Sequence, residues 1–297
     1  MATITQPKAA SASQIKQISR FAGDAVDKVL ADLGLDNPSV QRVIEHGDEF
    51  VAAIREAALT SLKDLSVSDK FKDEEVGSSY GYLSGYTPKD IREQVQVLEQ
   101  LFPGVGKANE ALAGGTLPPQ AEGWFAIPRW SKIAPTYHEA LQKVLDLIKQ
   151  NRGGKFHNYR EGQLGQERLR RVSRTEAGFK KSKVDQADYD ILVVPAQFGI
   201  RHRGRSVRRA REIFLTNEFG LGAYEVGIML LTHPERLQHY DDLWIDCAGD
   251  EYDDPAADDR FARAPVFVFS GGRVGFDAGW FGNANENCGS ASVFLPQ

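Results

Sequence analysis

The sequence predicts an α+β protein, in which a helical N-terminal region is followed by a mixed α/β region with a C-terminal β-hairpin. Over residues 1–75, apolar side chains recur at the spacing of amphipathic helices. Residues 80–297 combine such stretches with short runs rich in Val, Ile and Phe, which are typical of strands. The 297 residues are 41% hydrophobic and 26% charged, which excludes a collagen-like, wholly disordered or coiled-coil chain. We therefore expect a helical region over 1–75 and an α+β domain over 80–297.

The N-terminal region is expected to contain amphipathic helices whose apolar faces point inward. Gln14–Leu33 is the longest, and Gly34 ends it. A short helix begins at Asn37-Pro38, and Asp48 can cap a third. Residues 66–87 are rich in charge, Ser, Gly and Tyr, which predicts a linker or a surface loop.

The elements expected in the second region follow from caps, apolar periodicity and turn residues. Its first half predicts a helix capped by Thr87, a strand at Trp124–Ile127, a helix from Thr136 to about Gln150, a helix near Gln166–Arg174 and a strand at Tyr189–Val194. Its second half predicts helices at Ser206–Leu215 and Ala223–Leu231, a strand at Leu243–Cys247, and a hairpin around Ser270–Arg273.

Charge is segregated along the chain. Residues 151–212 hold 16 Lys+Arg against 7 Asp+Glu, a basic part with net charge +9, whereas residues 213–297 hold 4 against 14, an acidic part with net charge −10. The whole chain has a net charge of −5, so this contrast is hidden in the total. Either the two parts face each other, or each faces an outside partner of opposite sign.

The strongest concentration of charge lies between a predicted strand and a predicted helix. Six arginines fall within eleven residues, and Ser206 is a suitable N-cap for the helix that follows. Cations in a first helical turn oppose the helix dipole, so their presence there favours a bound anion such as phosphate. The candidate anion or nucleic-acid site in this loop is Arg201, His202, Arg203, Arg205, Ser206, Arg208, Arg209 and Arg211. The alternative is that these arginines pair with carboxylates of the acidic part.

A second basic stretch extends this candidate site. Aromatic residues alternate with cations around Lys155 and Arg160, and further arginines follow at Arg170 and Arg171. Proteins use this mixture to stack unpaired bases and contact phosphates. A solvated basic loop with one or two buried rings is the alternative.

The acidic part contains a weak candidate for a metal site. Asp246 is expected near the end of a strand, and Asp250 and Glu251 follow a glycine turn. Oxygen ligands in such places can hold a divalent metal ion. The segment lacks the pattern of an EF-hand, so an acidic surface loop is the alternative.

No recognisable catalytic motif is present in the sequence. The six histidines are scattered, there is no Gly-x-Ser-x-Gly elbow, and no paired Cys/His spacing suggests zinc. The sequence therefore favours a protein that is not an enzyme, and it predicts no cofactor. Two cysteines and the lack of a long apolar run predict a cytoplasmic protein without a membrane partner.

Three short stretches carry a resemblance to other proteins. They are residues 122–128, Asn217–Gly222 and the terminal Phe294–Gln297. In these stretches the chain resembles a group of uncharacterised bacterial proteins, over most of residues 80–297. The resemblance implies one cytoplasmic bacterial family and carries over no catalytic residue.

Together these features predict a binding protein that docks a polyanion, nucleic acid above all, on its arginine-rich loop. One alternative is a metal-assisted hydrolase of a phosphate ester, in which the acidic strand end holds the ion. Another is a structural or assembly protein whose opposite charges pair between copies, so self-association is a further expectation.

Overall fold

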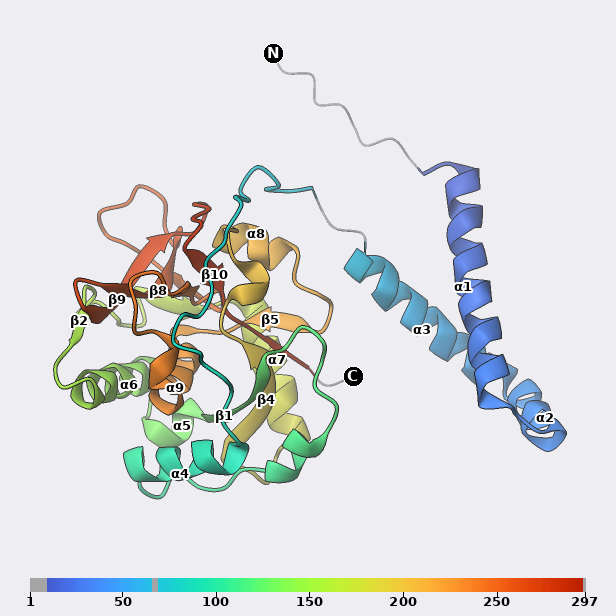
Figure 1. Cartoon of the computed structure of the whole chain (residues 1–297), viewed down its shortest axis with the longest axis horizontal. Helices are drawn as coiled ribbons and strands as arrows, with labels where there is room; N and C mark the ends of the chain where they lie inside the picture. The colour runs from blue at the N-terminus through green and yellow to red at the C-terminus, as the bar shows by residue number, and fades with distance from the viewer. Residues whose placement is uncertain (1–9, 66–68, 296–297) are drawn as a thin grey trace, which may run out of the picture. The chain divides into compact units, whose positions relative to one another are not determined.

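A computed structural model of the chain describes residues 10–65 and 69–295. Helices dominate the N-terminal region and the strands follow, so the predicted α+β class is confirmed (Figure 1). The chain divides into two compact units, Met1–Ser66 and Val67–Gln297. None of the helices in the described ranges is long and apolar enough to cross a membrane.

The first unit consists of three helices with well-formed ends. They are α1 (Ala12–Leu33), α2 (Asn37–Glu45) and α3 (Gly47–Leu65). Ser11 caps α1 by accepting a hydrogen bond from the backbone of Gln14, and Asp36 caps α2 in the same way. Gly34 ends α1 with φ of 53°, a left-handed conformation that costs glycine little.

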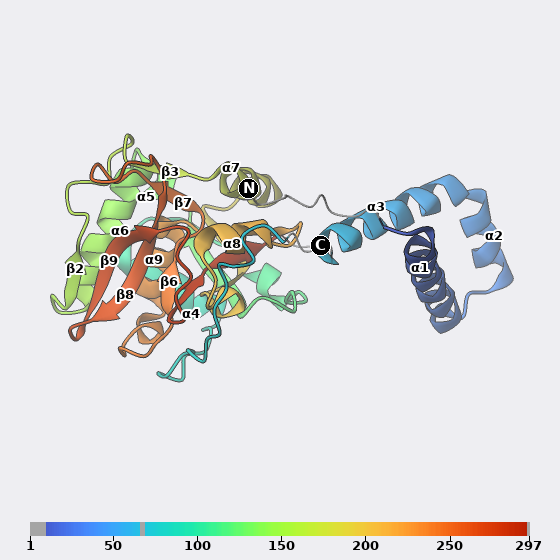
Figure 2. The ribbon, with the colours of Figure 1, turned by 90° about the horizontal axis from the view of Figure 1, so that it is seen from above.

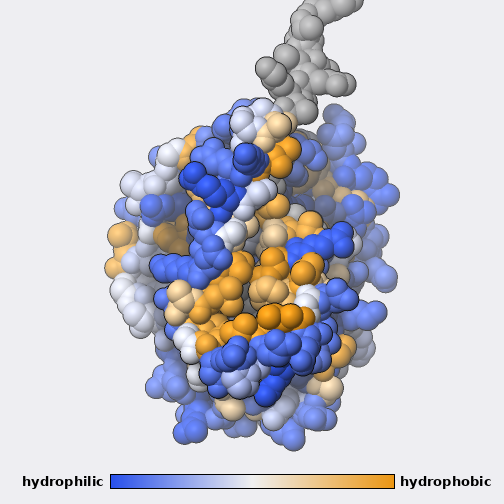
Figure 3. Space-filling view, turned by 90° about the vertical axis from the view of Figure 1, so that its right-hand side faces the viewer, coloured by the Kyte–Doolittle hydropathy of each residue, from blue (hydrophilic) through white to orange (hydrophobic). Residues whose placement is uncertain are grey.

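The apolar faces of these helices are exposed, contrary to the expectation that they point inward. Neither α1 nor α2 contains a buried residue, and Phe21 and Val51 are 54% and 63% exposed. Figure 3 shows one face of the chain, which carries a broad apolar patch edged by hydrophilic residues. Three helices joined in this way have too few neighbours to enclose a core, so amphipathic periodicity here predicted helices correctly but burial wrongly.

The second unit contains a four-stranded antiparallel sheet. Its strand order is β1 (Gly123–Pro128), β4 (Ile191–Gln197), β11 (Ser292–Phe294) and β5 (Glu218–Gly220). Every residue of β4 is buried. The strand continues through Pro195, which was expected to end it and instead faces Trp124 of β1.

The second unit also contains a larger sheet, in which some strand pairs are parallel and others antiparallel. Its path is β10 (Cys288–Ser290), β6 (Trp244–Asp246), β8 (Arg263–Ser270), β7 (Asp250–Tyr252) and β3 (Leu169–Arg171). Strand β9 (Arg273–Trp280) pairs with β8 and with β2 (Phe156–Asn158). The predicted hairpin is confirmed, because Gly271 and Gly272 turn the chain between β8 and β9 with φ of 59° and 73°.

Helices and short turns complete the second unit. Helices α6 (Tyr137–Asn151) and α9 (Ala223–Thr232) pack on each other (Figures 1 and 2). Their buried side chains join those of β1 and β4 in one core. The remaining elements are α4 (Ile91–Leu101), α5 (Trp130–Ile133), α7 (Ser173–Asp185), α8 (Val207–Glu212) and the 3₁₀ turns η1 (Glu110–Gly114), η2 (Ile200–His202) and η3 (Pro234–Arg236).

Two predictions about helices are wrong, one about where a helix begins and one about whether a segment is helical. Asp90, not Thr87, caps α4, because its carboxylate accepts a hydrogen bond from the backbone of Arg92 at 2.8 Å. The helix expected near Gln166–Arg174 is instead β3 followed by α7. Pairing with β7 holds Leu169–Arg171 extended, and this long-range contact is not encoded in local spacing.

Candidate anion-binding pocket

The arginine-rich loop does not stand open to an outside anion. Arg209 is only 4% exposed, and its Nε donates to Glu75 Oε1 at 2.5 Å. Arg208 pairs with Glu74 through its Nε at 2.7 Å. Ser206 caps α8 as predicted, and its Oγ also donates to Glu74 at 2.6 Å. Although burial raises the pKa of Glu74, the hydrogen bonds from Arg208 and Ser206 outweigh it and lower that pKa.

The other side chains of the loop are also engaged. Arg201 lies 3.2 Å from a carboxylate oxygen of the buried Glu218, and His202 Nε2 lies 2.7 Å from the other. Burial raises the pKa of Glu218, but His202 and Arg201 outweigh that effect and hold it at about 2. The remaining three make these contacts: Arg205 to Glu75 at 3.2 Å, Arg211 to Glu251 at 3.2 Å, and Arg203 to the Tyr80 carbonyl at 2.9 Å.

The premise of an unpaired cationic loop is therefore wrong for Arg201, Arg205, Arg208, Arg209 and Arg211. For Arg205, Arg208 and Arg209 the physical reason is that residues 74–76 fold back across the loop, where a bridge joins Glu75 to Arg205. Arg201 and Arg211 instead pair with Glu218 and Glu251 of the acidic part, as the alternative interpretation expected. The sequence predicted a linker there, so these carboxylates were not considered as partners. Whether the loop binds nucleic acid stays a prediction, with Arg203 as its exposed arginine.

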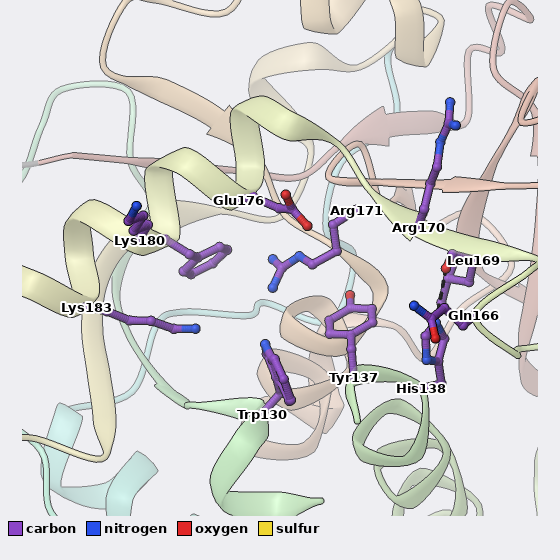
Figure 4. Close-up of a pocket in the computed structure, with 11 residues that line it drawn as sticks. Trp130, Tyr137, His138, Gln166, Leu169, Arg170, Arg171, Glu176, Lys180 and Lys183 are labelled. Atoms are coloured by element: carbon purple, nitrogen blue, oxygen red, sulfur yellow. Dashed lines mark hydrogen bonds between the residues drawn. The ribbon is translucent and has the colours of Figure 1, made fainter. Parts of the chain in front are cut away.

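The second basic stretch has a mixed outcome. Arg160 is held by Asp277 at 2.7 Å, which leaves it little freedom for an outside phosphate. Lys155 is exposed and directly precedes β2, which pairs with β9 and not with the arginine-rich loop. Arg170 is exposed but lies 2.8 Å from Glu251. Only Arg171, among the anion-site residues of this stretch, is both buried and directed into a cavity (Figure 4).

The candidate metal ligands do not converge. Asp246 lines one cavity, whereas Asp250 lies under another and accepts a hydrogen bond from Tyr137. Glu251 is occupied by Arg170 and Arg211. No group of three or more His, Cys, Asp or Glu side chains within residues 10–65 and 69–295 is arranged to hold a metal ion. The expected metal site is therefore not formed by these three carboxylates.

The cavity that receives Arg171 has a volume of about 490 Å³ and is rich in cations and aromatic rings. We call it the Arg171 pocket, and Figure 4 shows the side chains around it. Its basic residues are Arg170, Arg171, Lys180 and Lys183, against one carboxylate, Glu176. Its apolar wall is Trp130, Tyr137 and Phe179.

Helix α7 supplies four of the lining residues because of their spacing. Glu176, Phe179, Lys180 and Lys183 lie three, four and seven residues apart, which places them on one face of the helix. Strand β3 enters from the other side and ends two residues before the helix begins, so Arg171 projects beneath it. A short turn between a strand and a helix thus brings an arginine and two lysines to one cavity.

Arg171 is clamped between rings and buried carboxylates. Its Cζ lies 4.8 Å from the centre of the Tyr137 ring and 4.9 Å from that of Phe179. Its Nη2 lies 3.0 Å from Oε1 of Glu225, which is 2% exposed. The Nε and Nη2 atoms nevertheless make no aligned hydrogen bond with any residue in the described ranges. The rings and the two carboxylates therefore fix the guanidinium in place.

Asp250 supports this clamp from below. It accepts hydrogen bonds from Tyr137 Oη at 2.6 Å and from the backbone of Ala223 at 2.7 Å. Burial raises the pKa of Asp250 to about 6, although Arg171 opposes the shift. Gly222 is required for this approach, since a Cβ there would stand 2.5 Å from Tyr137 Oη and 2.7 Å from Asp250 Oδ1.

Lys183 faces the same cavity without a carboxylate of its own. Its Nζ lies 5.7 Å from the centre of the Trp130 ring and makes no ion pair with any described carboxylate. Burial lowers the pKa of Lys183, and the nearby charge of Arg171 lowers it further. Figure 4 shows the two cationic groups pointing toward one another across the cavity. Two like charges held in this way are stabilised by an anion between them.

Sequence reasoning identified Arg170 and Arg171 but missed the rest of the pocket. Trp130, Tyr137, Lys180 and Lys183 were not among the residues of the predicted site. The spacing of residues 176, 179, 180 and 183 carries the signal, but it becomes visible only when a helix is placed over Ser173–Asp185.

Comparison with known proteins adds no residue role to this geometry. No protein-family model, no curated protein and no solved structure shows a significant match to the chain. The assignment of a function therefore depends on the chemistry of the described residues alone.

Proposed function

We propose that this protein binds a small organic anion in the Arg171 pocket. The observation that carries the proposal is the convergence of Arg171 and Lys183 on one cavity, in which Lys183 has no ion pair with a described carboxylate. A phosphate or carboxylate between the two cationic groups would offset their repulsion and accept a charge-assisted hydrogen bond from Lys183. Asp250 and Glu225 hold the arginine from behind, so it is oriented before the ligand arrives.

The wall of the pocket favours an anion that also carries an apolar or aromatic body. Trp130, Tyr137 and Phe179 surround the cationic groups. A volume of about 490 Å³ is within the range of ligand pockets and exceeds what a bare phosphate needs. We therefore propose an organic phosphate or carboxylate of moderate size.

A long nucleic acid fits this geometry less well than a small anion. Phosphate-driven binding requires a succession of accessible cations along a surface. In the arginine-rich loop, Arg208 and Arg209 pair with Glu74 and Glu75, so an incoming phosphate would have to displace carboxylates. We keep nucleic acid as a competing outcome of the test. A cytoplasmic location is part of the same proposal, because Cys247 and Cys288 are free, buried thiols.

Calorimetry with phenyl phosphate, inorganic phosphate and phenol tests the proposal. We expect phenyl phosphate to bind most tightly, inorganic phosphate more weakly, and phenol least. Inorganic phosphate lacks the ring that packs on the apolar wall, and phenol lacks the anionic group that pairs with the cations. Lys183→Gln should weaken phenyl phosphate binding by roughly tenfold, through loss of one charge-assisted contact. Lys155→Gln is the matched control, since Lys155 is exposed and lies outside the pocket.

Two results would overturn the proposal. The first is equal binding of phenyl phosphate by the wild type and Lys183→Gln. The second is salt-dependent binding of a single-stranded RNA oligomer that Arg203→Ala weakens and Lys183→Gln leaves unchanged, which would assign the function to the arginine-rich loop instead.

A further inference from the structure

A second cavity, of about 320 Å³, lies on the larger sheet and has the opposite chemistry. We call it the Asp246 pocket. Residues of β6, β8 and β9 and of the segment that follows β9 form its lining. Three aromatic residues, two carboxylates and two amides contribute: Tyr159, Trp244, Trp280, Asp246, Asp277, Asn283 and Asn285. No Lys, Arg or His is among the lining residues, and none of them lines the Arg171 pocket.

Asp246 is the unmatched charge in this cavity. Its carboxylate is partly buried and makes no hydrogen bond or ion pair with any residue in the described ranges. Burial raises the pKa of Asp246 to about 7, and Arg211 opposes the shift only in part. A partly buried carboxylate that lines a cavity and has no partner in the protein can accept an outside cation.

The neighbouring carboxylate does not share this need. Asp277 accepts a hydrogen bond from Arg160 Nε at 2.7 Å, which matches its charge within the protein. Cys288, at another point of the lining, stays a neutral thiol because burial and the charge of Asp246 raise its pKa. Of the two carboxylates in this pocket, Asp246 is therefore the one without a cationic partner among the described residues.

We propose that the Asp246 pocket binds a small organic cation, an amine or a quaternary ammonium group. Asp246 supplies the counter-charge, and the aromatic residues Trp244, Trp280 and Tyr159 supply surfaces that attract cations more than neutral groups. A cavity of about 320 Å³ lies at the small end of ligand pockets, which suits a compact cation.

Gly279 is an exposed glycine at the edge of this pocket. It lies on β9 and lines the cavity, and no heavy atom stands within 4 Å of where its Cβ would be. Its backbone is not in the left-handed region, so a larger residue can be placed there without strain. A leucine at this position therefore adds bulk at the edge of the cavity without a clash with the sheet, which provides a blocking variant.

Calorimetry on the full chain with choline and with 3,3-dimethylbutan-1-ol tests the proposal, since the two molecules have nearly the same shape and only choline is charged. We expect choline to bind at least tenfold more tightly. Asp246→Asn should weaken choline binding by roughly tenfold or more and should fold normally, because the carboxylate has no protein partner to lose. Gly279→Leu should abolish binding, while Gly77→Leu, at an exposed glycine with equal free space, should not change it.

The proposal is overturned if choline does not bind at millimolar concentration, if the uncharged analogue binds equally well, or if Asp246→Asn binds choline like the wild type. Circular dichroism of each variant separates blocked binding from failure to fold. Phenyl phosphate binding should persist in Gly279→Leu, because the two pockets share no residue. Failure of the cation site would therefore leave the anion site standing, and the reverse also holds.

Discussion

The charges of the arginine-rich loop and the charges of the two pockets differ in whether the protein itself supplies their partners. In the loop, Arg208 and Arg209 lie against Glu74 and Glu75 in closed ion pairs. In the pockets, Lys183 and Asp246 have no ion pair with any described side chain. The loop is much the more conspicuous in the sequence, yet the pockets offer the better binding chemistry.

This difference separates structural charges from charges available to a ligand. A buried ion pair contributes little net stability, but removal of one partner strands the other and is strongly destabilising. An unpaired buried charge behaves in the opposite way, because its removal relieves the cost of burial. Substitution of single residues therefore distinguishes the two classes, and four predictions follow in order of expected effect.

Arg209→Ala should lower the free energy of unfolding by about 3–5 kcal/mol, because Arg209 is buried and its loss leaves Glu75 with a weaker set of partners. Urea denaturation of the variant and the wild type measures the change. Arg203→Ala is the control, since Arg203 is exposed and its side chain contacts only a carbonyl in the described structure, and it should stay within about 0.5 kcal/mol. A stable Arg209→Ala variant would mean that the loop charges are dispensable.

Gly222→Ala should destabilise the protein by roughly 2–3 kcal/mol and also weaken the anion site. The new Cβ would stand 2.5 Å from Tyr137 Oη, so both Tyr137 and Asp250 must move from beneath Arg171. Phenyl phosphate calorimetry, combined with denaturation, measures both effects. Gly81→Ala serves as the control, because no heavy atom stands within 4 Å of its Cβ position. Destabilisation without any loss of affinity would show that the orientation of Arg171 does not matter for binding.

Asp246→Asn should change how stability depends on pH. The folded protein raises the pKa of Asp246 from 3.8 to about 7, so between these values it holds a proton that the unfolded chain releases. This contribution is present at low pH and is lost as the pH rises through 7. The wild type should therefore gain roughly 1–2 kcal/mol relative to Asp246→Asn between pH 8 and pH 5. Comparison of the two proteins cancels the contributions of His233 and Asp250, and equal pH profiles would show that Asp246 is matched by another group.

Local sequence patterns predicted many helices, caps and turns, but they did not predict which distant residues these elements contact. The cap of α6 at Thr136, the hairpin at Gly271-Gly272 and the cap of α8 at Ser206 were all predictable, because each depends on residues within a few positions. The pairing of Glu74 with Arg208 joins residues 134 positions apart, and no local pattern encodes it. The same limit explains why β3 was predicted as a helix.

Contacts between residues far apart in sequence affected the prediction of the candidate sites more than the prediction of the fold. Arg171 was predicted within a basic stretch, but its distinction from Arg170 depends on Tyr137 and Glu225, which come from other parts of the chain. Asp246 was considered as a metal ligand because acidic neighbours follow it in sequence. Strand β8 instead lies between β6, which carries Asp246, and β7, which carries Asp250, and Asp246 lines a pocket with aromatic residues.

Lys183→Met should have the smallest effect on stability of the four variants. It contrasts with Arg209→Ala, which should have the largest effect. Methionine keeps the length of the side chain beside Trp130 and removes a charge whose pKa burial has already lowered. We therefore expect a change in unfolding free energy within about 0.5 kcal/mol, and a slight gain in stability is consistent with relief of repulsion from Arg171. Phenyl phosphate affinity should nevertheless fall by roughly tenfold. A loss of stability comparable to that of Arg209→Ala would place Lys183 among the structural charges, and the distinction between the loop and the Arg171 pocket would fail.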